Sequence, residues 1–254
     1  MLTHLNSLTT LQCSGIKTAD FLQGQLTCDI RTLAKHGDSS LAACCDHRGR
    51  MIANFWVIHW HDDFLLLLPK SVSLVLCEHL KKYAVFSDVI ITPIDHFFIA
   101  ECTNEIKKND NQVAIPLPQQ NRQLMIVSQN PFPDMHITED ETEWRKNNIR
   151  DQLAILCDKT SLLFTPQMIN LEKLGGVSFN KGCYVGQEIV ARTHYLGTLK
   201  RHLKQFTLSS AHTLTAGDPV KNNQAVVIGV IVEAVLASDD RYDVLAVMQD
   251  GYRK

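Results

Sequence analysis

The sequence predicts an α+β protein whose last fifth is a small all-β unit. Before residue 103, strand-length apolar runs alternate with two stretches of helical periodicity. Further helical patterns follow between residues 138 and 197. From Lys200 the pattern changes to short β-rich segments with turn signals at AGDP and SDDR. The 254 residues suffice for one large domain or for two or three small ones that share a sizeable core.

The first sixty residues read as a strand, a short helix and a pair of strands. LTTLQCSG, which begins at Leu8, has the strand pattern, and Thr18 is the expected N-cap of the helix that follows. Residues 40–60 read as two strands joined by a turn at DHRG, where Gly49 can take a positive φ.

Residues 63–102 read as a strand, a longer helix and two more strands. DFLLLLP is the first strand, and apolar residues at 72, 75, 76 and 80 then predict an amphipathic helix over 70–84. DVIITPI and FFIAEC are the later strands. Residues 103–121 are polar and contain prolines, so we expect a loop with at most one edge strand.

A third helix is predicted after residue 138. TEDE has the capping-box form, with Thr138 as the cap and Glu141 three residues beyond it. A helix through Trp144 and Ile149 should follow.

The composition is ordinary for a soluble globular protein. With 45% hydrophobic residues, a net charge of -2 and a pI of about 6.6, it does not indicate a nucleic-acid binder. No apolar run is long enough to cross a bilayer, and the N-terminus lacks a secretory signal, so we expect a cytoplasmic protein without a membrane partner. The eight cysteines include no C-x-x-C pair, and most are expected to be reduced core residues.

The stretch SFNKGCYVGQEIVARTHYLGTLKR, from 178 to 201, raises a chemical question. Its apolar spacing predicts a helix that begins near Val185 or Gly186 and ends at Gly197. Cys183 then lies at or just before the first turn, where the helix dipole favours a thiolate.

The spacing alone leaves two interpretations of Cys183 open. It is either an activated thiol, which Lys181 would support by folding over the sulfur, or a small apolar group packed in a glycine-rich turn. No histidine is adjacent in sequence, which weakens a protease-like Cys–His pair.

KGCYVGQE, preceded by NLEKLGGVSFN and followed by IVAR, resembles the signature of the YgfZ family of folate-binding proteins. That family is related to the glycine-cleavage T-protein, an aminomethyltransferase. Four more segments resemble family segments in the same order: FLQGQLTCDI from Phe21, CDHRGRMIANFWV from Cys45, LKKYAVFSDVII from Leu80 and FTPQMINLEKLGG from Phe164. The resemblance extends to about Arg201, and the C-terminal unit fits more loosely.

The resemblance implies a T-protein-like (aminomethyltransferase-like) fold around a central channel that binds tetrahydrofolate or a one-carbon derivative. Residues 1–130 would form an α+β folate-binding portion, intertwined with a second portion over 131–199, and residues 200–254 a small β-barrel-like unit. The implied role is an accessory one, which supports iron–sulfur enzymes and, through them, tRNA modification. Iron–sulfur proteins and tRNA-modifying enzymes are the implied partners.

The resemblance also assigns roles to residues of the cysteine turn. Cys183 would be the reactive group and Lys181 its electrostatic partner. Tyr184, Gln187 and Glu188 would form the supporting shell around the cysteine and the folate.

Other folate-binding residues are implied outside this turn. Trp144 matches a family tryptophan that contacts folate, although a core anchor explains it equally well. A second such tryptophan falls at Leu8, which keeps an apolar wall but cannot stack on a pterin ring. Gln23 and Gln25 would line the channel, or would simply cap and turn their helix.

One departure bears on catalysis. Ala53 and Asn54 stand where aminomethyltransferases carry the acidic residues of a GGIxDD-type turn, and neither can act as a general base. This argues against glycine-cleavage activity. The alternative is a folate-dependent one-carbon transferase with an unknown acceptor.

Two other kinds of site were weighed. Cys44, Cys45, His47, His59 and His61 fit no closed zinc spacing, so no metal is expected. The basic residues of ARTHYLGTLKRHLK would touch phosphates or the polyglutamate tail of a folate, or would form a solvated face; they are Arg192, His194, Lys200, Arg201, His202 and Lys204. Direct tRNA contact is a third hypothesis.

Overall fold

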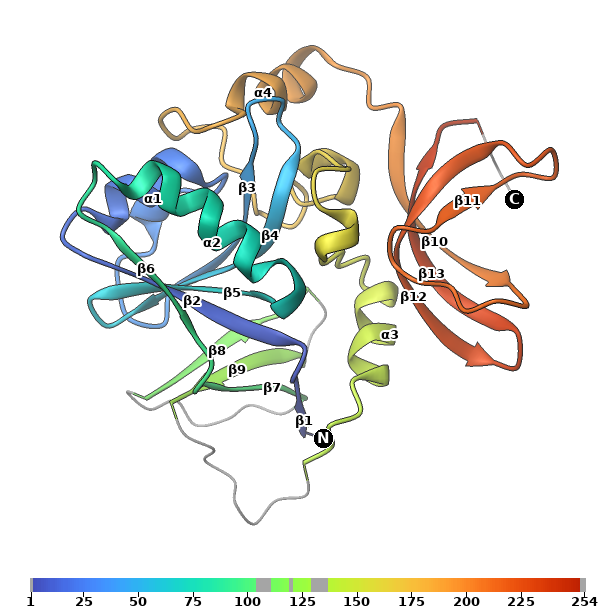
Figure 1. Cartoon of the computed structure of the whole chain (residues 1–254), viewed down its shortest axis with the longest axis horizontal. Helices are drawn as coiled ribbons and strands as arrows, with labels where there is room; N and C mark the ends of the chain where they lie inside the picture. The colour runs from blue at the N-terminus through green and yellow to red at the C-terminus, as the bar shows by residue number, and fades with distance from the viewer. Residues whose placement is uncertain (1, 104–110, 119–120, 129–136, 252–254) are drawn as a thin grey trace.

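The computed structural model describes residues 2–103, 111–118, 121–128 and 137–251. These described residues contain three β-sheets. A five-stranded sheet and a four-stranded sheet lie on one side of helix α3 (Thr142–Arg150), and a second four-stranded sheet lies on the other (Figure 1). The predicted α+β class is confirmed.

The five-stranded sheet has the order β3-β4-β5-β2-β6, and all its neighbours are antiparallel. Its strands are β2 (Leu8–Ser14), β3 (Ser39–Cys45), β4 (Met51–Trp60), β5 (Asp63–Pro69) and β6 (Ile90–Ile94). Alternate side chains of β5 point to opposite faces. Leu66 and Leu68 pack with helices α1 (Thr18–Gln25) and α2 (Lys70–Ala84), while Leu65 and Leu67 pack toward the second sheet.

The second sheet has the order β1-β7-β9-β8. Its strands are β1 (Leu2–His4), β7 (Phe98–Cys102), β8 (Gln112–Pro116) and β9 (Gln123–Val127). β8 is the edge strand expected within residues 103–121, of which 104–110 and 119–120 lie outside the described residues. The predicted boundary between residues 130 and 131 lies outside them as well. The sequence did not predict β1 and β9.

The C-terminal sheet has the order β10-β13-β12-β11, and its curved shape confirms the predicted small β unit (Figure 1). Its strands are β10 (Arg201–Ser209), β11 (Pro219–Lys221), β12 (Val227–Ser238) and β13 (Arg241–Gln249). The register of β12 shifts between Ile231 and Glu233 and again between Leu236 and Ser238. Such bulges increase the local twist and bend the strand.

Helix α4 (Gln187–Leu196) lies between α3 and the C-terminal sheet, and the described residues also form three short 3₁₀ helices. The 3₁₀ helices are η1 (Ile30–Thr32), η2 (Asp158–Thr160) and η3 (Pro166–Ile169). Within the described residues, each helix is too short or too polar to cross a bilayer.

Three local predictions were wrong. The N-cap of α1 is Lys17, and Thr18 is the first helical residue, with its hydroxyl donating to the Gly15 carbonyl at 2.7 Å. Val75 of α2 is 46% exposed, because the buried stripe runs through Val72, Leu76 and Leu80 without it.

The predicted capping box before α3 does not form either. α3 begins at Thr142, whose N–H donates to the Asp140 carboxylate at 2.9 Å. The Glu141 carboxylate instead accepts from the Ser7 N–H at 2.7 Å. α3 still passes through Trp144 and Ile149, as predicted.

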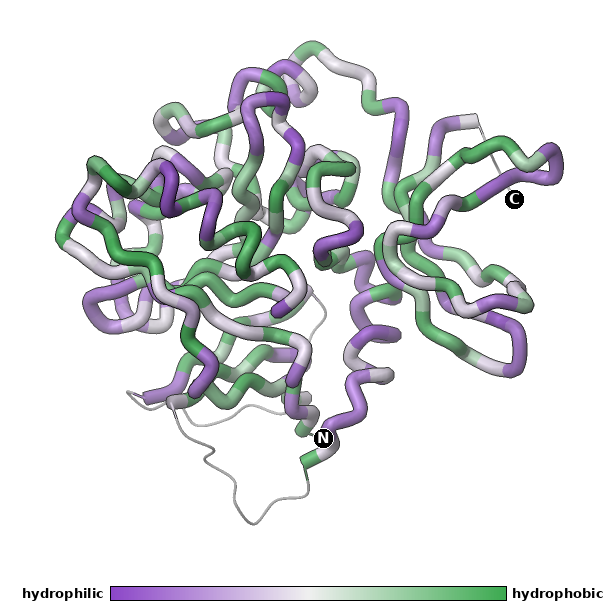
Figure 2. Tube along the Cα trace, viewed as in Figure 1, coloured by the Kyte–Doolittle hydropathy of each residue, from purple (hydrophilic) through white to green (hydrophobic). Residues whose placement is uncertain are grey.

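α3 differs from the sheets around it in polarity. Most of its length is hydrophilic (Figure 2), and its buried residues are Trp144, Asn148 and Ile149. A helix of this kind presents polar groups to the space beside it, in addition to a short apolar stripe.

Candidate functional site

A cavity of about 650 Å³ lies between α3, the junction of β5 with α2, the start of β2, and β12. We call it the ring cavity. Its lining includes Leu8 and Trp144, which belong to the same apolar cluster and are both almost fully buried. Trp144 is therefore a core residue and a wall of the cavity at once. The fold thus brings together two of the residues that the resemblance assigned to folate, and their role in binding stays a prediction.

Arg122 supports the Trp144 wall from behind. Its guanidinium carbon lies 5.3 Å from the centre of the Trp144 ring. The same side chain, 7% exposed, forms ion pairs with Glu101 at 2.5 Å and with Asp151, and donates to the Asn148 side chain at 3.0 Å. Sequence reasoning missed this network, because its members lie on separate segments and no spacing links them.

Polar contacts define the edges of the ring cavity. Arg145 donates to the Glu233 carboxylate at 2.6 Å and to the Ala234 carbonyl at 2.8 Å, and so joins α3 to β12. The bond to Glu233 raises the pKa of Arg145. Glu141 accepts from the backbone and the hydroxyl of Ser7, and so joins α3 to the start of β2. Contacts between portions far apart in sequence thus form two edges of the cavity.

The KGCYVGQE turn lies elsewhere, against α1 and the β3–β4 turn. Lys181 Nζ donates to the carbonyls of Leu26 at 2.7 Å and Cys28 at 2.6 Å, and lies 5.1 Å from the Tyr184 ring centre. Burial lowers the pKa of Lys181 to about 8, and the neighbouring Cys28 acts in the opposite direction. Lys181 thus fastens the turn to the segment after α1. Its action on Cys183 stays a prediction.

Two glycines allow the cysteine turn and the DHRG turn to pack closely. Gly186, the N-cap of α4, has φ +84°, and a Cβ there would lie 2.5 Å from the Asp46 carbonyl oxygen. Gly49 has φ +69°, which confirms the predicted positive φ, and a Cβ there would lie 3.0 Å from Ile189 Cβ. α4 begins and ends where the sequence predicted, and Cys183 precedes its N-cap.

Gln23 and Gln25 have different environments. The Gln23 side chain donates to Asp29 at 2.9 Å and accepts from the Ile30 N–H at 2.8 Å, so it braces the turn after α1. For Gln23, these contacts support the interpretation that its side chain caps and turns the end of α1, rather than lining the channel. The Gln25 Oε1 atom is buried and has no hydrogen-bond partner among the described residues.

The other residues of the predicted shell stay close to the turn. The Gln187 side chain accepts from the Tyr184 N–H at 3.3 Å, and Glu188 pairs with Arg192 at 2.7 Å on the exposed face of α4. Burial raises the pKa of Tyr184, whose hydroxyl has no partner within the described part of the chain. These residues are absent from the lining of the ring cavity, so the predicted site divides into two groups.

Cys183 is the exposed member of the eight cysteines, and six of the others are buried. Burial raises the pKa of Cys28 and of Cys44 to about 12. We expect one thiol of the native protein to react rapidly with an aromatic disulfide reagent at pH 7.5, and the Cys183→Ser variant to lose that phase. Cys157, which is partly buried, should react more slowly. A fast phase that persists in Cys183→Ser would contradict the placement of this turn.

Ala53 and Asn54 have structural positions. Ala53 is completely buried, and the Asn54 amide donates to the Ala154 carbonyl at 2.8 Å and accepts from the Leu156 N–H at 2.9 Å. Asn54 therefore holds the segment that lines one side of the ring cavity, with its amide facing backbone groups.

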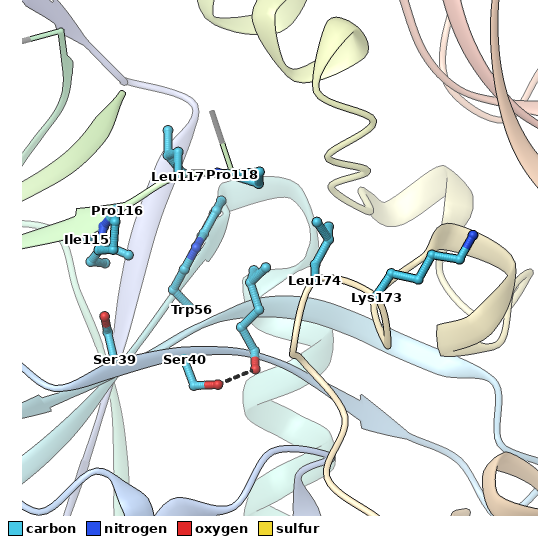
Figure 3. A pocket seen from close by; sticks show the side chains of 10 residues that line it. Ser39, Ser40, Trp56, Ile115, Pro116, Leu117, Pro118, Lys173 and Leu174 are labelled. Atoms are coloured by element: carbon cyan, nitrogen blue, oxygen red, sulfur yellow. Dashed lines mark hydrogen bonds between the residues drawn. The ribbon is translucent and has the colours of Figure 1, made fainter. Parts of the chain in front are cut away.

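A second cavity, of about 510 Å³, was not predicted. Figure 3 shows the Trp56 ring between the Ile115–Pro118 segment and Leu174, while the Lys173 side chain extends away from it. None of the residues proposed from the sequence lines this cavity.

The residues weighed as metal ligands do not converge. Cys44 and Cys45 belong to clusters on opposite faces of their sheet. His59 stacks on Phe64 at 4.9 Å, and His61 stacks on His36 at 4.4 Å. Across the described ranges, no group of three or more His, Cys, Asp or Glu residues is placed to hold a metal ion.

Comparison with known proteins places the chain in a family. No family model matches it. The tRNA-modifying protein YgfZ of Vibrio atlanticus is 30% identical over 245 residues, which cover 89% of this chain and 75% of that protein. The protein of the same name from Sodalis glossinidius is 32% identical over 238 residues, 82% and 71% of the two chains. The chain belongs to the YgfZ family.

The fold of this YgfZ-family chain is also that of a solved structure. The glycine cleavage system aminomethyltransferase T from Bartonella henselae matches the whole chain and 79% of its own length, with a TM-score of 0.70 and 13% identity. At that identity the likeness concerns the fold, and it confirms the predicted T-protein-like architecture.

Proposed function

We propose that this YgfZ-family protein binds tetrahydrofolate in the ring cavity and acts in the cytoplasm as an accessory factor. It would support the assembly or repair of iron–sulfur enzymes and, through them, tRNA modification. The curated relatives carry the name tRNA-modifying protein, which supports a role of this general type. The single observation that carries the folate part is the meeting of Leu8 and Trp144 in one cavity.

The ring cavity fits a folate in size and chemistry. Cavities of roughly 300–1,000 Å³ hold cofactor-sized ligands, and this one measures about 650 Å³. Trp144, Leu8, Leu153 and Ile155 give an apolar wall for a flat ring, and the side chains of Asn148 and Glu139 supply polar groups at its edge. Leu8 can pack against the ring of the folate but cannot stack on it. Trp144 would therefore supply the aromatic stacking that two tryptophans would otherwise provide together.

The separation of the two groups supports an accessory role. The cysteine turn is absent from the lining of the ring cavity, and the Asn54 amide faces backbone groups. Folate bound at Trp144 would therefore lack a nearby carboxylate at position 54 to accept a proton. A folate-dependent one-carbon transferase, which the aminomethyltransferase-like fold favours, remains the alternative. Turnover of a methylene or formyl group would support it.

Equilibrium titration with tetrahydrofolate tests the proposal. We expect the wild-type protein to bind and Trp144→Ala to bind about 10- to 100-fold more weakly, because the variant loses the stacking wall. Trp144→Phe should keep most of the affinity, and Cys183→Ala all of it. An unfolding curve for each variant separates loss of the site from loss of the fold. Absence of binding by the wild type, or equal affinity of the wild type and Trp144→Ala, would refute the proposed folate site.

A further inference from the structure

We propose that strand β6 is the interface of a symmetric dimer, in which β6 of a second copy of this chain pairs with it in antiparallel fashion. The two five-stranded sheets then form one continuous sheet across the two-fold axis. The residues that carry this inference are absent from the lining of the ring cavity. The dimer therefore does not depend on the proposed function.

β6 has an open edge. It is the last strand of its sheet, and among the described residues only β2 pairs with it. An edge strand offers its unpaired N–H and C=O groups to another chain unless charges or other segments protect it. The edge strand β10 carries Arg201 and Lys204, and the edge strand β3 is bridged by Leu26 at Cys44. The sequence of β6, IITPI, contains no charged residue.

The backbone of β6 directs its odd-numbered residues to the open side. The Ile94 carbonyl accepts from the Thr10 hydroxyl at 2.9 Å, on the side of β2. Because the backbone groups of alternate residues point to opposite sides of a strand, those of Ile91 and Pro93 face outward. This is the position in which an edge strand tolerates a proline, whose nitrogen carries no hydrogen.

These outward groups match those of a second β6 about a two-fold axis at Ile91. The N–H and C=O of Ile91 exchange two hydrogen bonds with Ile91 of the copy. The Val89 N–H donates to the Pro93 carbonyl of the copy, and the two-fold axis repeats this bond. The pairing thus uses Pro93 only as an acceptor, which is the role that its backbone can take.

A groove beside this edge supplies apolar surface. It measures about 460 Å³ and is lined by the end of α2, the connection to β6 and the first residues of the strand. Val85 and Ile90 in this lining are 70% and 66% exposed, and Phe86, which follows Val85, is 92% exposed. Several exposed apolar side chains in one place are typical of an interaction surface.

The charges in the groove have opposite signs at its two ends. β5 and β6 both pair antiparallel with β2, so they are parallel to each other, and α2 between them runs in the opposite direction. Lys81 lies one turn before the end of α2 and therefore beside the strand, whereas Asp88 lies before the start of the strand. The two-fold axis brings Lys81 of each copy toward Asp88 of the other.

Both charges are available to a second copy. Lys81 is exposed and forms no ion pair in the described part of the chain. Asp88 pairs with Lys17 at 3.6 Å, but its side chain is 87% exposed and can accept from a second cation. A surface with both signs, arranged so that a two-fold axis pairs them, favours a second copy over a partner of a single charge sign.

Sedimentation velocity of the full-length protein, from about 1 to 200 µM, tests the dimer. We expect the wild type to form a dimer as its concentration rises. Lys81→Asp and Asp88→Lys should each weaken the dimer at least about tenfold, because like charges then meet at both ends of the groove. A mixture of the two variants should form the dimer again, because each pair then joins opposite charges.

Val85→Ser and Leu74→Ser are a matched pair for the apolar surface. Both residues belong to the α2 region and have similar exposure, 70% and 63%, but only Val85 lines the groove. Val85→Ser should weaken the dimer, and Leu74→Ser should leave it unchanged. Asp88 has φ +52°, so an unfolding curve shows whether Asp88→Lys keeps the turn.

Two results would overturn the dimer at β6. One is a wild type that stays monomeric over the whole concentration range. The other is a dimer that the Lys81→Asp, Asp88→Lys and Val85→Ser variants all keep, which would place the interface elsewhere. If both charge variants are folded monomers and their mixture stays monomeric, the antiparallel two-fold pairing is wrong.

Discussion

Replacing Arg122 with alanine is expected to lower the free energy of unfolding by about 3–5 kcal/mol, because it leaves buried carboxylates without their partner. The guanidinium pairs with Glu101 and Asp151, whose side chains are 5% and 0% exposed. Each of these carboxylates would have to remain charged in an apolar environment, take up a proton or open the structure to water. Urea unfolding followed by far-UV circular dichroism measures the loss.

The matched control removes an arginine from an exposed ion pair. The side chains of Arg192 and Glu188 are 62% and 79% exposed, and Arg192→Ala should change stability by less than about 0.5 kcal/mol. Arg122→Met combined with Glu101→Gln and Asp151→Asn should recover part of the loss, since the buried charges are then removed together. Equal stability of Arg122→Ala and Arg192→Ala would show that the network around Arg122 is hydrated.

This network also connects the stability of the protein with its proposed site. Arg122 lies against the Trp144 ring, and Asn148 contacts Arg122 and lines the ring cavity. A shift of the guanidinium would move both groups. We therefore attribute to Arg122 a positioning role at the cavity, which the sequence did not indicate.

The sequence predicted those elements whose pattern is local and strong. α2 spans Lys70–Ala84 as predicted, and β5 spans Asp63–Pro69, because long apolar runs at a fixed period leave little choice of structure. β9 was missed because Gln123–Val127 is short, follows a polar stretch and is stabilised by pairing with β7 and β8. Its strand character comes from partners that local sequence does not reveal.

The same reason explains the error before α3. Thr138 and Glu141 have the spacing of a capping box, and the local pattern favours it. The Glu141 carboxylate is instead held by Ser7, 134 residues away in the chain. Long-range contacts of this kind override a local preference when they satisfy the same hydrogen-bonding group.

For the candidate site, the sequence predicted the turn better than the cavity. The start of α4 and the positive φ of Gly49 follow from local rules. The ring cavity is built from β2, α2, α3 and β12, which meet only in the folded chain. The resemblance therefore supplied Leu8 and Trp144, whereas Arg122 became visible from the arrangement of the folded chain.

The two glycines that flank Cys183 should respond very differently to alanine. Gly186→Ala places a Cβ at 2.5 Å from the Asp46 carbonyl oxygen on a backbone with φ +84°. The left-handed conformation alone costs about 1–2 kcal/mol for a residue with a Cβ, and the clash with backbone adds to it. We expect a total loss of at least about 2 kcal/mol, together with a displaced cysteine turn.

Gly182→Ala is the matched control within the same motif. A Cβ at Gly182 meets no heavy atom within 4 Å, and its φ lies outside the left-handed range. Its stability should stay within about 0.5 kcal/mol of the wild type. The labelling rate of Cys183 gives a second readout. Gly186→Ala should change this rate, because the cysteine turn loses its close contact with the DHRG turn. Gly182→Ala should change the rate much less. Two variants of equal stability and equal labelling rate would mean that Cys183 is not held by the contact between these turns. The reason for glycine at these positions of KGCYVGQE would then have to be sought in contacts with a bound partner.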